Sequence, residues 1–418
     1  MIFNDSDRVN AQRIFENIAA RTADPQGGID RASYGRGETR ALAELLMEAN
    51  KLGVYAGTDH ADNLVMSLEQ SLAVTRDKVT VIGSHLDSVP RGGNYDGLAG
   101  VVAALLILGK ARERGVTKPL RGVGLRGEES AWFGVPHLGA KAMLGKLSLA
   151  DLALIRRGDP EATLARCMGS CGAEIGKVES GYRSFEPASI EEYWELHIEQ
   201  GPVLAERQIP VGIVTNIRGH ARTTTARVIG EAAHSGTTPM GNRKDAVRRF
   251  CALVTMLAQT RKRMAVRDVD IVFTIGTVNT DPARHSVTTV ADEVKFSLDV
   301  RSVDPTVPQL FLEQAKEHGM DTDGEAWLDL GSVRYTAPIS LSRRLMTRAS
   351  MAAHSLGIVP MELPSGAGHD AGVFADAGVP TGMIFVRNYH GSHNPQEEMH
   401  MDDFMRGLEV LWATVIGS

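Results

Sequence analysis

The segment from residue 79 to residue 112 constrains the fold of this chain more than any other. It opens with VTVI, a short β-branched run followed by a turn, and this pattern predicts a buried strand. The apolar block at 98–108 is too long for a strand and predicts a buried helix. The loop between them is rich in Gly and Pro and carries His85, Asp87 and Asp96. Because α/β folds bind ligands at the carboxyl ends of their strands, we expect a functional site in this loop.

Two of these side chains suit a zinc-like ion. His85 offers a ring nitrogen and Asp96 offers a carboxylate oxygen, and both are common ligands of such ions. Asp87 stands two residues after His85 and is placed to accept the proton of the other ring nitrogen, which would fix the tautomer. The alternative is a polar loop in which Asp96 caps the following helix. Both interpretations stay open on this segment alone, because His-x-Asp pairs are common by chance.

Composition excludes several classes of function. The net charge of −6 gives no basic stripe, so we expect no nucleic acid partner. No apolar run reaches about 18 residues, so we expect no membrane span. The first residues are acidic and lack the apolar core of a signal peptide. Three cysteines in 418 residues indicate a reducing compartment, and we expect a cytoplasmic protein in which Cys167 and Cys171 are ordinary thiols.

Apolar spacing predicts elements on both sides of this segment. Helices are expected at 7–21, 37–52 and 340–356, and strands within 57–68, from 120 onward, in 209–220 and at 381–386. The stretch 148–190 is polar, and we expect it to be irregular.

The pattern changes at about residue 218. From there the chain shows an alternating strand at 221–232, a helix at 245–263, strands at 271–278 and 294–302, and a helix at 307–318. Such a β-α-β-β-α-β order forms a compact two-layer unit. We therefore expect residues 218–334 to form an inserted domain, with 1–217 and 335–418 together forming the other.

Further candidate ligands follow other predicted strands. Glu128 and Glu129 end the strand that starts near 120, and adjacent buried carboxylates need a partner such as a cation. One of the two would bind metal while the other handles protons. Several histidines also lie in turns after predicted strands: His85, His197, His369, His390 and His393. Together with Asp96, Glu128 and Glu129 they predict a two-metal hydrolase.

Six motifs now give a resemblance to a known family. In chain order they are GSHLDSVPRGGNYDG, the Glu128-Glu129 pair, ELHIEQGPVL, AHSGTTPMGNRKDA, SGAGHDA and SHNPQE. The chain resembles the amidase/carbamoylase branch of the M20 metallopeptidase family over nearly its whole length. That branch includes N-carbamoyl-L-amino-acid hydrolases, β-ureidopropionases of the bacterial type and allantoate amidohydrolases.

The resemblance implies an α/β mixed-sheet catalytic domain with two divalent metal ions and an inserted α+β domain that serves as a dimerisation domain or lid. It implies that Asp96 bridges the ions, with His85 and His197 completing one site. Glu129 and His393 would complete the other, since SHNPQE selects His393 over His390. Zinc is favoured, with manganese, cobalt and nickel as alternatives.

The catalytic and substrate-binding roles also follow from the resemblance. Glu128 corresponds to the general base and His234 to an oxyanion donor on the inserted domain. In the family that histidine serves the partner subunit, so we expect a homodimer. Arg301 corresponds to the arginine that holds the substrate carboxylate. Gln200 and the backbone from Gly366 to Gly368 would also contact the substrate.

The chain departs from the family pattern at three positions. Thr288 stands where an asparagine contacts the substrate, and Ala291 replaces a proline nearby. Asn279 or His285 is a candidate to take over the missing contact. Trp132 replaces an arginine after the Glu128-Glu129 pair. We therefore expect intact metal chemistry with altered leaving-group and side-chain pockets.

The expected function is hydrolysis of the C–N bond of an N-carbamoyl-L-amino acid or a similar ureido acid, which is a small carboxylate-bearing substrate. Allantoate is an alternative, and so is an N-acyl-amino acid, for which Trp132 would provide an apolar wall. HIEQGPVL and AHSGTTPM disfavour a simple aminopeptidase. A non-catalytic binding protein on the same fold is a fourth option, which the retention of the five ligands and Glu128 argues against.

Overall fold

The computed structural model describes residues 2–72, 78–320 and 326–417 of the chain. Within it the chain divides into two compact units. Unit 1 comprises Met1–Thr215 and Ser340–Ser418, and unit 2 comprises Asn216–Ile339.

Unit 1 is built around a nine-stranded sheet, counted over the described residues, with the order β1-β2-β4-β3-β5-β17-β6-β15 and β16 paired with β6. Its strands are β1 (Tyr55–Thr58), β2 (Leu64–Ser67), β3 (Val79–His85), β4 (Leu120–Leu125), β5 (Ile190–Ile198), β6 (Val211–Ile217), β15 (Ile339–Ser340), β16 (Met361–Ser365) and β17 (Thr381–Val386). The four central strands, β4, β3, β5 and β17, are parallel, whereas β1, β2 and β6 pair antiparallel toward the edges. The expected mixed α/β sheet is confirmed.

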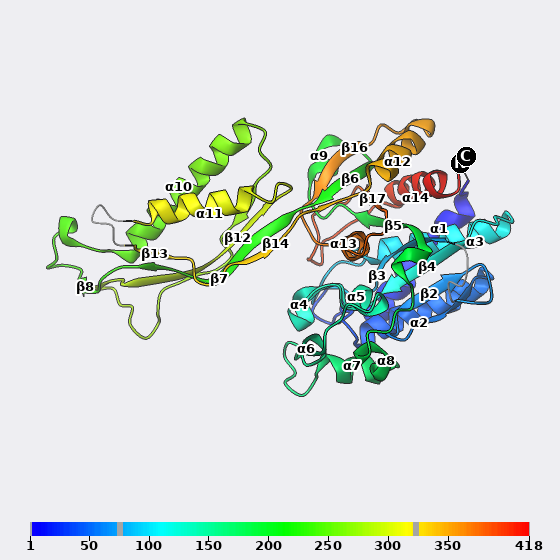
Figure 1. The fold of residues 1–418 in the computed structure, drawn as a ribbon, viewed down its shortest axis with the longest axis horizontal. Helices are drawn as coiled ribbons and strands as arrows, with labels where there is room; N and C mark the ends of the chain where they lie inside the picture. Colours follow the sequence, from blue (N-terminus) through cyan, green and yellow to red (C-terminus); the bar gives the residue numbers. More distant parts are fainter. Residues whose placement is uncertain (1, 73–77, 321–325, 418) are drawn as a thin grey trace. The chain divides into compact units, whose positions relative to one another are not determined.

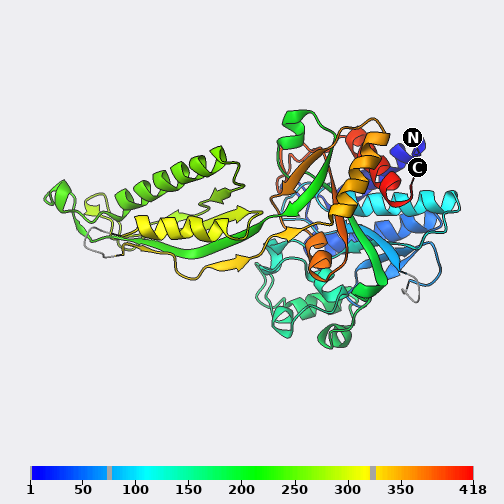
Figure 2. The ribbon, with the colours of Figure 1, turned by 45° about the horizontal axis from the view of Figure 1, so that its top comes forward.

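Helices pack on this sheet and supply most of the apolar core of unit 1. The helices that contribute to this core are α1 (Asp5–Thr22), α2 (Arg36–Lys51), α3 (Leu98–Glu113), α12 (Arg343–Ser355) and α14 (Met401–Val415). Helix α13 (Asp370–Asp376) packs on β17 and β5, and α4 (Ser130–Phe133), α5 (Leu138–Met143) and α9 (Val203–Arg207) are short helices in the connecting segments. Helix α3 is buried along almost its whole length, as its apolar sequence requires. Phe3 packs edge to face on Trp412 in α14, so the two ends of the chain lie side by side (Figures 1 and 2).

The stretch 148–190 is not irregular, and that expectation was wrong. It contains α6 (Leu149–Leu152), α7 (Leu164–Cys171), α8 (Ile175–Glu179) and the 3₁₀ turn Pro187–Ser189. Ser148 caps α6 with a capping box, and Thr163 caps α7 by accepting from the amide of Arg166. Helix α7 also buries Leu164 and Met168 in a small satellite core. Caps and packing therefore stabilise helices too short for apolar periodicity to reveal.

Unit 2 is a two-layer α+β unit whose main sheet has the order β10-β12-β7-β13, with β14 paired with β7 and β9 with β12. Its strands are β7 (Gly219–Ile229), β8 (Ala233–His234), β9 (Val272–Thr274), β10 (Val278–Asn279), β11 (Thr289–Val290), β12 (Glu293–Ser302), β13 (Leu328–Asp329) and β14 (Arg334–Thr336). Helices α10 (Ala246–Val266) and α11 (Val307–His318) cover one face of the sheet (Figure 1).

The strand expected at 271–278 is in fact two short strands, β9 and β10, separated by Ile275–Thr277. The helix expected at 340–356 begins only at Arg343, because Ile339 and Ser340 form the edge strand β15. Where the structure describes the chain, no helix combines the length and the apolar character that a bilayer span requires.

Candidate metal centre and active site

Four neighbouring parallel strands carry the candidate site at their carboxyl ends. His85 is the last residue of β3, and Glu128 follows β4 after a short turn. His197 lies near the end of β5, and His393 lies in the segment after β17. Because these strands are adjacent and parallel, side chains from distant parts of the sequence meet at one edge of the sheet.

The first cluster joins two histidines and one carboxylate. Oδ1 of Asp96 lies 3.1 Å from Nε2 of His197 and 3.5 Å from Nε2 of His85. The two Nε2 atoms are 3.4 Å apart. All three side chains are buried, and their candidate ligand atoms lie close enough together to hold one metal ion.

The second cluster uses the other oxygen of the same carboxylate. Nε2 of His393 lies 3.5 Å from Oδ2 of Asp96 and 3.3 Å from Oε1 of Glu129. These three residues also satisfy the distances for a candidate metal group. Asp96 is therefore shared between two groups of ligands, one at each of its oxygens.

The electrostatics of these clusters fit a cation. Oδ1 of Asp96 is buried and has no well-aligned hydrogen-bond donor among the described residues. Burial alone would raise the pKa of Asp96, but the contacts with His197 and His85 hold it well below its usual range. Burial raises the pKa of Glu129 to about 7 against the opposing effect of His393. The two clusters offer imidazole nitrogen atoms and carboxylate oxygen atoms, which are ligands that zinc and similar ions prefer.

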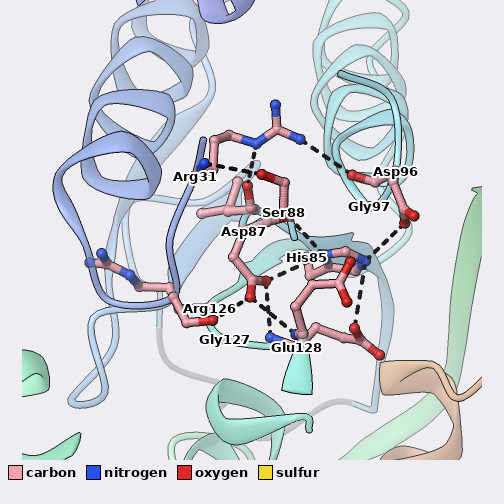
Figure 3. A network of polar contacts seen from close by, with 12 residues as sticks. Arg31, His85, Asp87, Ser88, Asp96, Gly97, Arg126, Gly127 and Glu128 are labelled. Atoms are coloured by element: carbon pink, nitrogen blue, oxygen red, sulfur yellow. Dashed lines mark hydrogen bonds and ion pairs between the residues drawn. The ribbon is translucent and has the colours of Figure 1, made fainter. Parts of the chain in front are cut away.

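Asp87 connects the first cluster to the Glu128-Glu129 segment (Figure 3). Its Oδ1 lies 3.3 Å from Nδ1 of His85 and accepts from the amide of Glu128 at 2.9 Å. Its Oδ2 accepts from the amide of Glu129 at 3.0 Å and from the hydroxyl of Ser33 at 2.6 Å. The backbone carbonyl oxygen of Asp87 also lies 3.2 Å from Nδ1 of His85, so Asp87 orients the imidazole through its carbonyl and its carboxylate. The carboxylate in addition fixes the backbone of both glutamates.

Sequence reasoning missed the residues that hold Asp96 itself. Oε1 of Glu397 accepts from the amides of Tyr95 at 2.8 Å and Asp96 at 3.1 Å. The hydroxyl of Ser392 contacts both Oδ2 of Asp96 and Oε2 of Glu397, so its single proton is shared between the two carboxylates. Arg31 is buried, and its guanidinium donates to the carbonyl oxygens of Leu86 and Asp96 (Figure 3). Ser392 and Glu397 belong to the SHNPQE motif, which was the available signal for them.

The other two histidines of the predicted set have different surroundings. His369 forms another buried candidate group with Glu195 and His197, and His85, Glu128 and Glu129 form a further one. Burial and the neighbouring His197 hold the pKa of His369 well below its usual value, so this imidazole is neutral. His390 is exposed and lies 3.4 Å from Glu398, outside every candidate metal group that the described residues form.

Comparison with known proteins identifies the family. The model of peptidase family M20/M25/M40 matches residues 81–416. The chain belongs to this family. It is 33% identical to an N-carbamoyl-L-amino acid amidohydrolase of Geobacillus stearothermophilus over 94% of this chain and 93% of the relative. It is 30% identical to an allantoate amidohydrolase of Escherichia coli K12, with 93% and 92% covered.

A solved structure agrees with this assignment. A hydantoinase/carbamoylase family amidase from Burkholderia ambifaria superposes with a TM-score of 0.83 at 28% identity, covering 98% of this chain and 95% of that one. The resemblance to the M20 family seen in the six motifs is thus confirmed.

In unit 1 of this M20 chain, Gln200 is the predicted substrate contact that touches a cluster. Nε2 of Gln200 donates to Oδ2 of Asp96 at 2.8 Å. Gly366 and Gly368 lie in the loop between β16 and α13. Trp132 donates from its indole nitrogen to the carbonyl oxygen of Ser88 at 2.7 Å, which ties it to the loop after β3.

The remaining predicted residues belong to unit 2. His234 is exposed at the end of β8, and its Nδ1 accepts from the amides of Gly236 and Thr237 at 3.1 and 3.3 Å. The carbonyl oxygen of Thr288 accepts from the amide of Ser235 at 2.9 Å, so Thr288 lies beside the His234 turn.

Arg301 lies on β12 and forms an ion pair with Asp299 at 2.8 Å. Asn279 is exposed on β10. His285 lies 2.8 Å from the hydroxyl of Thr280.

Proposed function

We propose that this M20 chain is a metal-dependent amidohydrolase that cleaves the C–N bond of an N-carbamoyl-L-amino acid or a similar ureido acid. The single observation that carries the proposal is the shared Asp96 carboxylate, with a His85–His197 pair at one oxygen and a Glu129–His393 pair at the other. Relatives that carry the name N-carbamoyl-L-amino acid amidohydrolase support the choice of bond.

Two divalent ions would occupy the site. His85, Asp96 and His197 would hold one ion, and Asp96, Glu129 and His393 would hold the other. The mixed nitrogen and oxygen ligands favour zinc, with manganese, cobalt and nickel as alternatives. When bound, such ions supply Lewis-acid chemistry by lowering the pKa of water and polarising a carbonyl group.

Glu128 is the proposed general base. Its carboxylate is almost fully buried, and its Oε2 lies 4.0 Å from Nε2 of His85, so this oxygen faces the first cluster. It would take a proton from the attacking water and deliver it to the leaving nitrogen. The hydrogen bond from the backbone amide of Glu128 to Oδ1 of Asp87 keeps the Glu128 backbone fixed during this transfer.

Unit 2 is proposed as a dimerisation and lid domain that contributes the remaining contacts. His234 would donate a hydrogen bond to the developing oxyanion in the partner subunit of a homodimer. Arg301 would bind the substrate carboxylate through its guanidinium group. Thr288 or Asn279 would contact the ureido group.

Gln200 and the backbone at Gly366 and Gly368 would complete the pocket from unit 1. The three free cysteines fit the reducing compartment of a cytoplasmic enzyme.

Allantoate is the second candidate substrate, because two relatives 30% identical to this chain are named allantoate amidohydrolases. An N-acyl-amino acid is the third, in which Trp132 would pack against the acyl group.

A substrate panel with separate ammonia and carbon dioxide detection tests the proposal. The metal-loaded enzyme should release both products from N-carbamoyl-L-amino acids, whereas allantoate would yield them together with ureidoglycine-type products. Turnover of N-acyl-amino acids without ammonia would replace the ureido assignment, and no turnover of any of these compounds would contradict the proposal.

A further inference from the structure

A turn in unit 1 brings His137 to Glu128. The amides of His137, Leu138 and Gly139 donate to the carbonyl oxygens of Glu128, Gly127 and Arg126 at 2.9, 2.8 and 2.7 Å. These three consecutive bonds fold the chain back on itself after Glu129. They place residue 137 directly opposite the proposed base, although nine positions separate the two in sequence.

The two oxygens of Glu128 face different neighbours. Oε2 is the oxygen 4.0 Å from Nε2 of His85 in the first cluster. Oε1 lies on the other side, 3.0 Å from Nδ1 of His137. A carboxylate base needs one oxygen directed at the proton that it accepts. A contact at the other oxygen therefore orients the group without blocking it.

His137 is itself held by Asp370, the first residue of α13. Nδ1 of His137 lies 3.6 Å from Oδ1 of Asp370, whose carboxylate is fully buried. Neither oxygen of Asp370 nor Nδ1 of His137 has a well-aligned hydrogen bond among the described residues, so His137 contacts Asp370 and Glu128 as ion pairs. Burial alone would lower the pKa of His137, but Glu128 and Asp370 raise it to about 10. The ring thus carries a proton on Nδ1 at neutral pH.

The opposite edge of the His137 ring faces the loop at residues 366–368, which contains two of the proposed substrate contacts. A Cβ atom at Gly368 would come within 3.1 Å of Nε2 of His137. The side chain is therefore confined between Glu128, Asp370 and the 366–368 loop, and only 14% of its surface is exposed. Confinement of this kind fixes the rotamer of a side chain and makes its contact with a neighbour reproducible.

We infer that His137 is a positioning residue that holds Oε1 of Glu128, with Asp370 anchoring the imidazole, so that Oε2 stays directed at the reacting water. This inference rests on the proposed role of Glu128 as general base. It assigns a function to a residue that lies outside all six sequence motifs. Removing His137 should leave metal and substrate binding intact while the base loses its orientation.

The test compares two variants that suit the backbone at this position. His137 has a φ of 62°, which Gly adopts freely and Asn adopts more readily than most residues. His137→Gly removes the ring, whereas His137→Asn keeps an amide nitrogen near the position of Nδ1. If the glycine variant does not fold, Asp370→Asn takes its place, because it removes the charge that anchors the imidazole and leaves residue 137 unchanged. His60→Asn is the matched control, because His60 is also buried in unit 1 and bonds to Ser184 instead.

Kinetics on the best carbamoyl substrate should separate the effects. We expect His137→Gly to lower kcat by about 10- to 100-fold, with KM and metal content within about threefold of wild type, the usual scale for loss of a supporting contact. His137→Asn should recover most of this loss, and His60→Asn should have wild-type kcat. In a Glu128→Gln background, His137→Gly should produce no further loss.

Three results would overturn the inference. They are a wild-type kcat in His137→Gly, an equal loss in His137→Asn, or a full additional loss in the Glu128→Gln background. The proposed function fails separately, through an undiminished kcat in Glu128→Gln alone. If Glu128→Gln is inactive and His137→Gly is fully active, the base assignment stands and only the positioning role is lost.

Discussion

Nε2 of His393 lies 3.5 Å from Oδ2 of Asp96, and the same nitrogen lies 3.3 Å from Glu129. The contact with Glu129 outweighs partial burial and raises the pKa of His393 to about 9. In the metal-free protein this imidazole is therefore protonated at neutral pH and pairs with two carboxylates. A metal ligand must be a neutral imidazole, so an ion has to displace this proton.

Metal affinity should consequently rise with pH up to about 9. Below its raised pKa, His393 holds a proton, so each unit of pH toward acid should weaken binding by about tenfold for this group alone. His85 and His197 also have raised pKa values, which steepens the dependence. Competition with a chromophoric chelator across this range measures the slope. In His393→Gln the slope should be smaller, and an affinity independent of pH in the wild type would contradict the ligand assignment.

The Glu128-Glu129 pair should divide into one base and one ligand. Glu128→Gln preserves shape but cannot accept a proton, so we expect kcat to fall by at least ~10²-fold with metal content near wild type. Glu129→Gln is the matched control and should lose metal, because Oε1 of Glu129 faces His393. Metal analysis and steady-state kinetics of both variants check this. The opposite pattern, with metal lost only in Glu128→Gln, would mean that the two roles are exchanged.

Asp87→Asn should weaken metal binding although Asp87 is not a proposed ligand. Its carboxylate faces His85 and accepts from the amides of Glu128 and Glu129, and an amide side chain offers one acceptor oxygen instead of two. We expect metal affinity to fall by about 10- to 100-fold. Thermal unfolding should show a loss of roughly 1–3 kcal/mol for a buried amide left unpaired. Ser33→Ala removes one donor but keeps the charge, so it should have the smaller effect on affinity, and equal effects would argue against this role.

The candidate site residues that the sequence predicted all follow strands or stand in motifs. His85, Glu129 and His197 lie at or just after the carboxyl ends of strands. Adjacent parallel strands bring these positions to one edge of the sheet, independently of the conformation of the loops. This is why the sheet class and the candidate ligands could be derived without a structure. His137 could not be found in this way, because the three bonds of the 126–139 turn decide where it lies.

The remaining misses have a similar cause. The short helices of 148–190 depend on caps such as Thr163 and on packing of Leu164, which leave little periodic signal in the sequence. Ser392 precedes the predicted ligand His393, but its residue type alone did not predict that its hydroxyl would contact both Asp96 and Glu397. Local patterns therefore predicted the elements, whereas the contacts that support the site arose from the tertiary arrangement.

His234 should act in the partner's active site. It lies on unit 2, in a Gly/Pro turn far in sequence from every candidate ligand. If it serves the partner, mixing inactive His234→Ala with inactive Glu128→Gln should restore activity, because a mixed dimer has one site with both residues intact. Random reassortment makes about half of the dimers mixed, so roughly a quarter of wild-type sites should return.

Differently tagged chains and co-expression verify that mixed dimers form. His234→Ala mixed with itself is the control and should stay inactive. If confirmed mixed dimers recover nothing, His234 serves its own subunit, while the metal chemistry is unaffected.

The central claim is that Asp96 bridges two metal ions, and the metal content of the protein tests it most directly. After loading with zinc and removal of free ions, mass spectrometry of the wild type should give two ions per chain, as in other two-metal hydrolase sites. Asp96→Asn should retain close to none, because each oxygen of Asp96 faces one of the two clusters. A wild-type chain that binds fewer than two ions, or an Asp96→Asn chain that still binds two, would contradict the account.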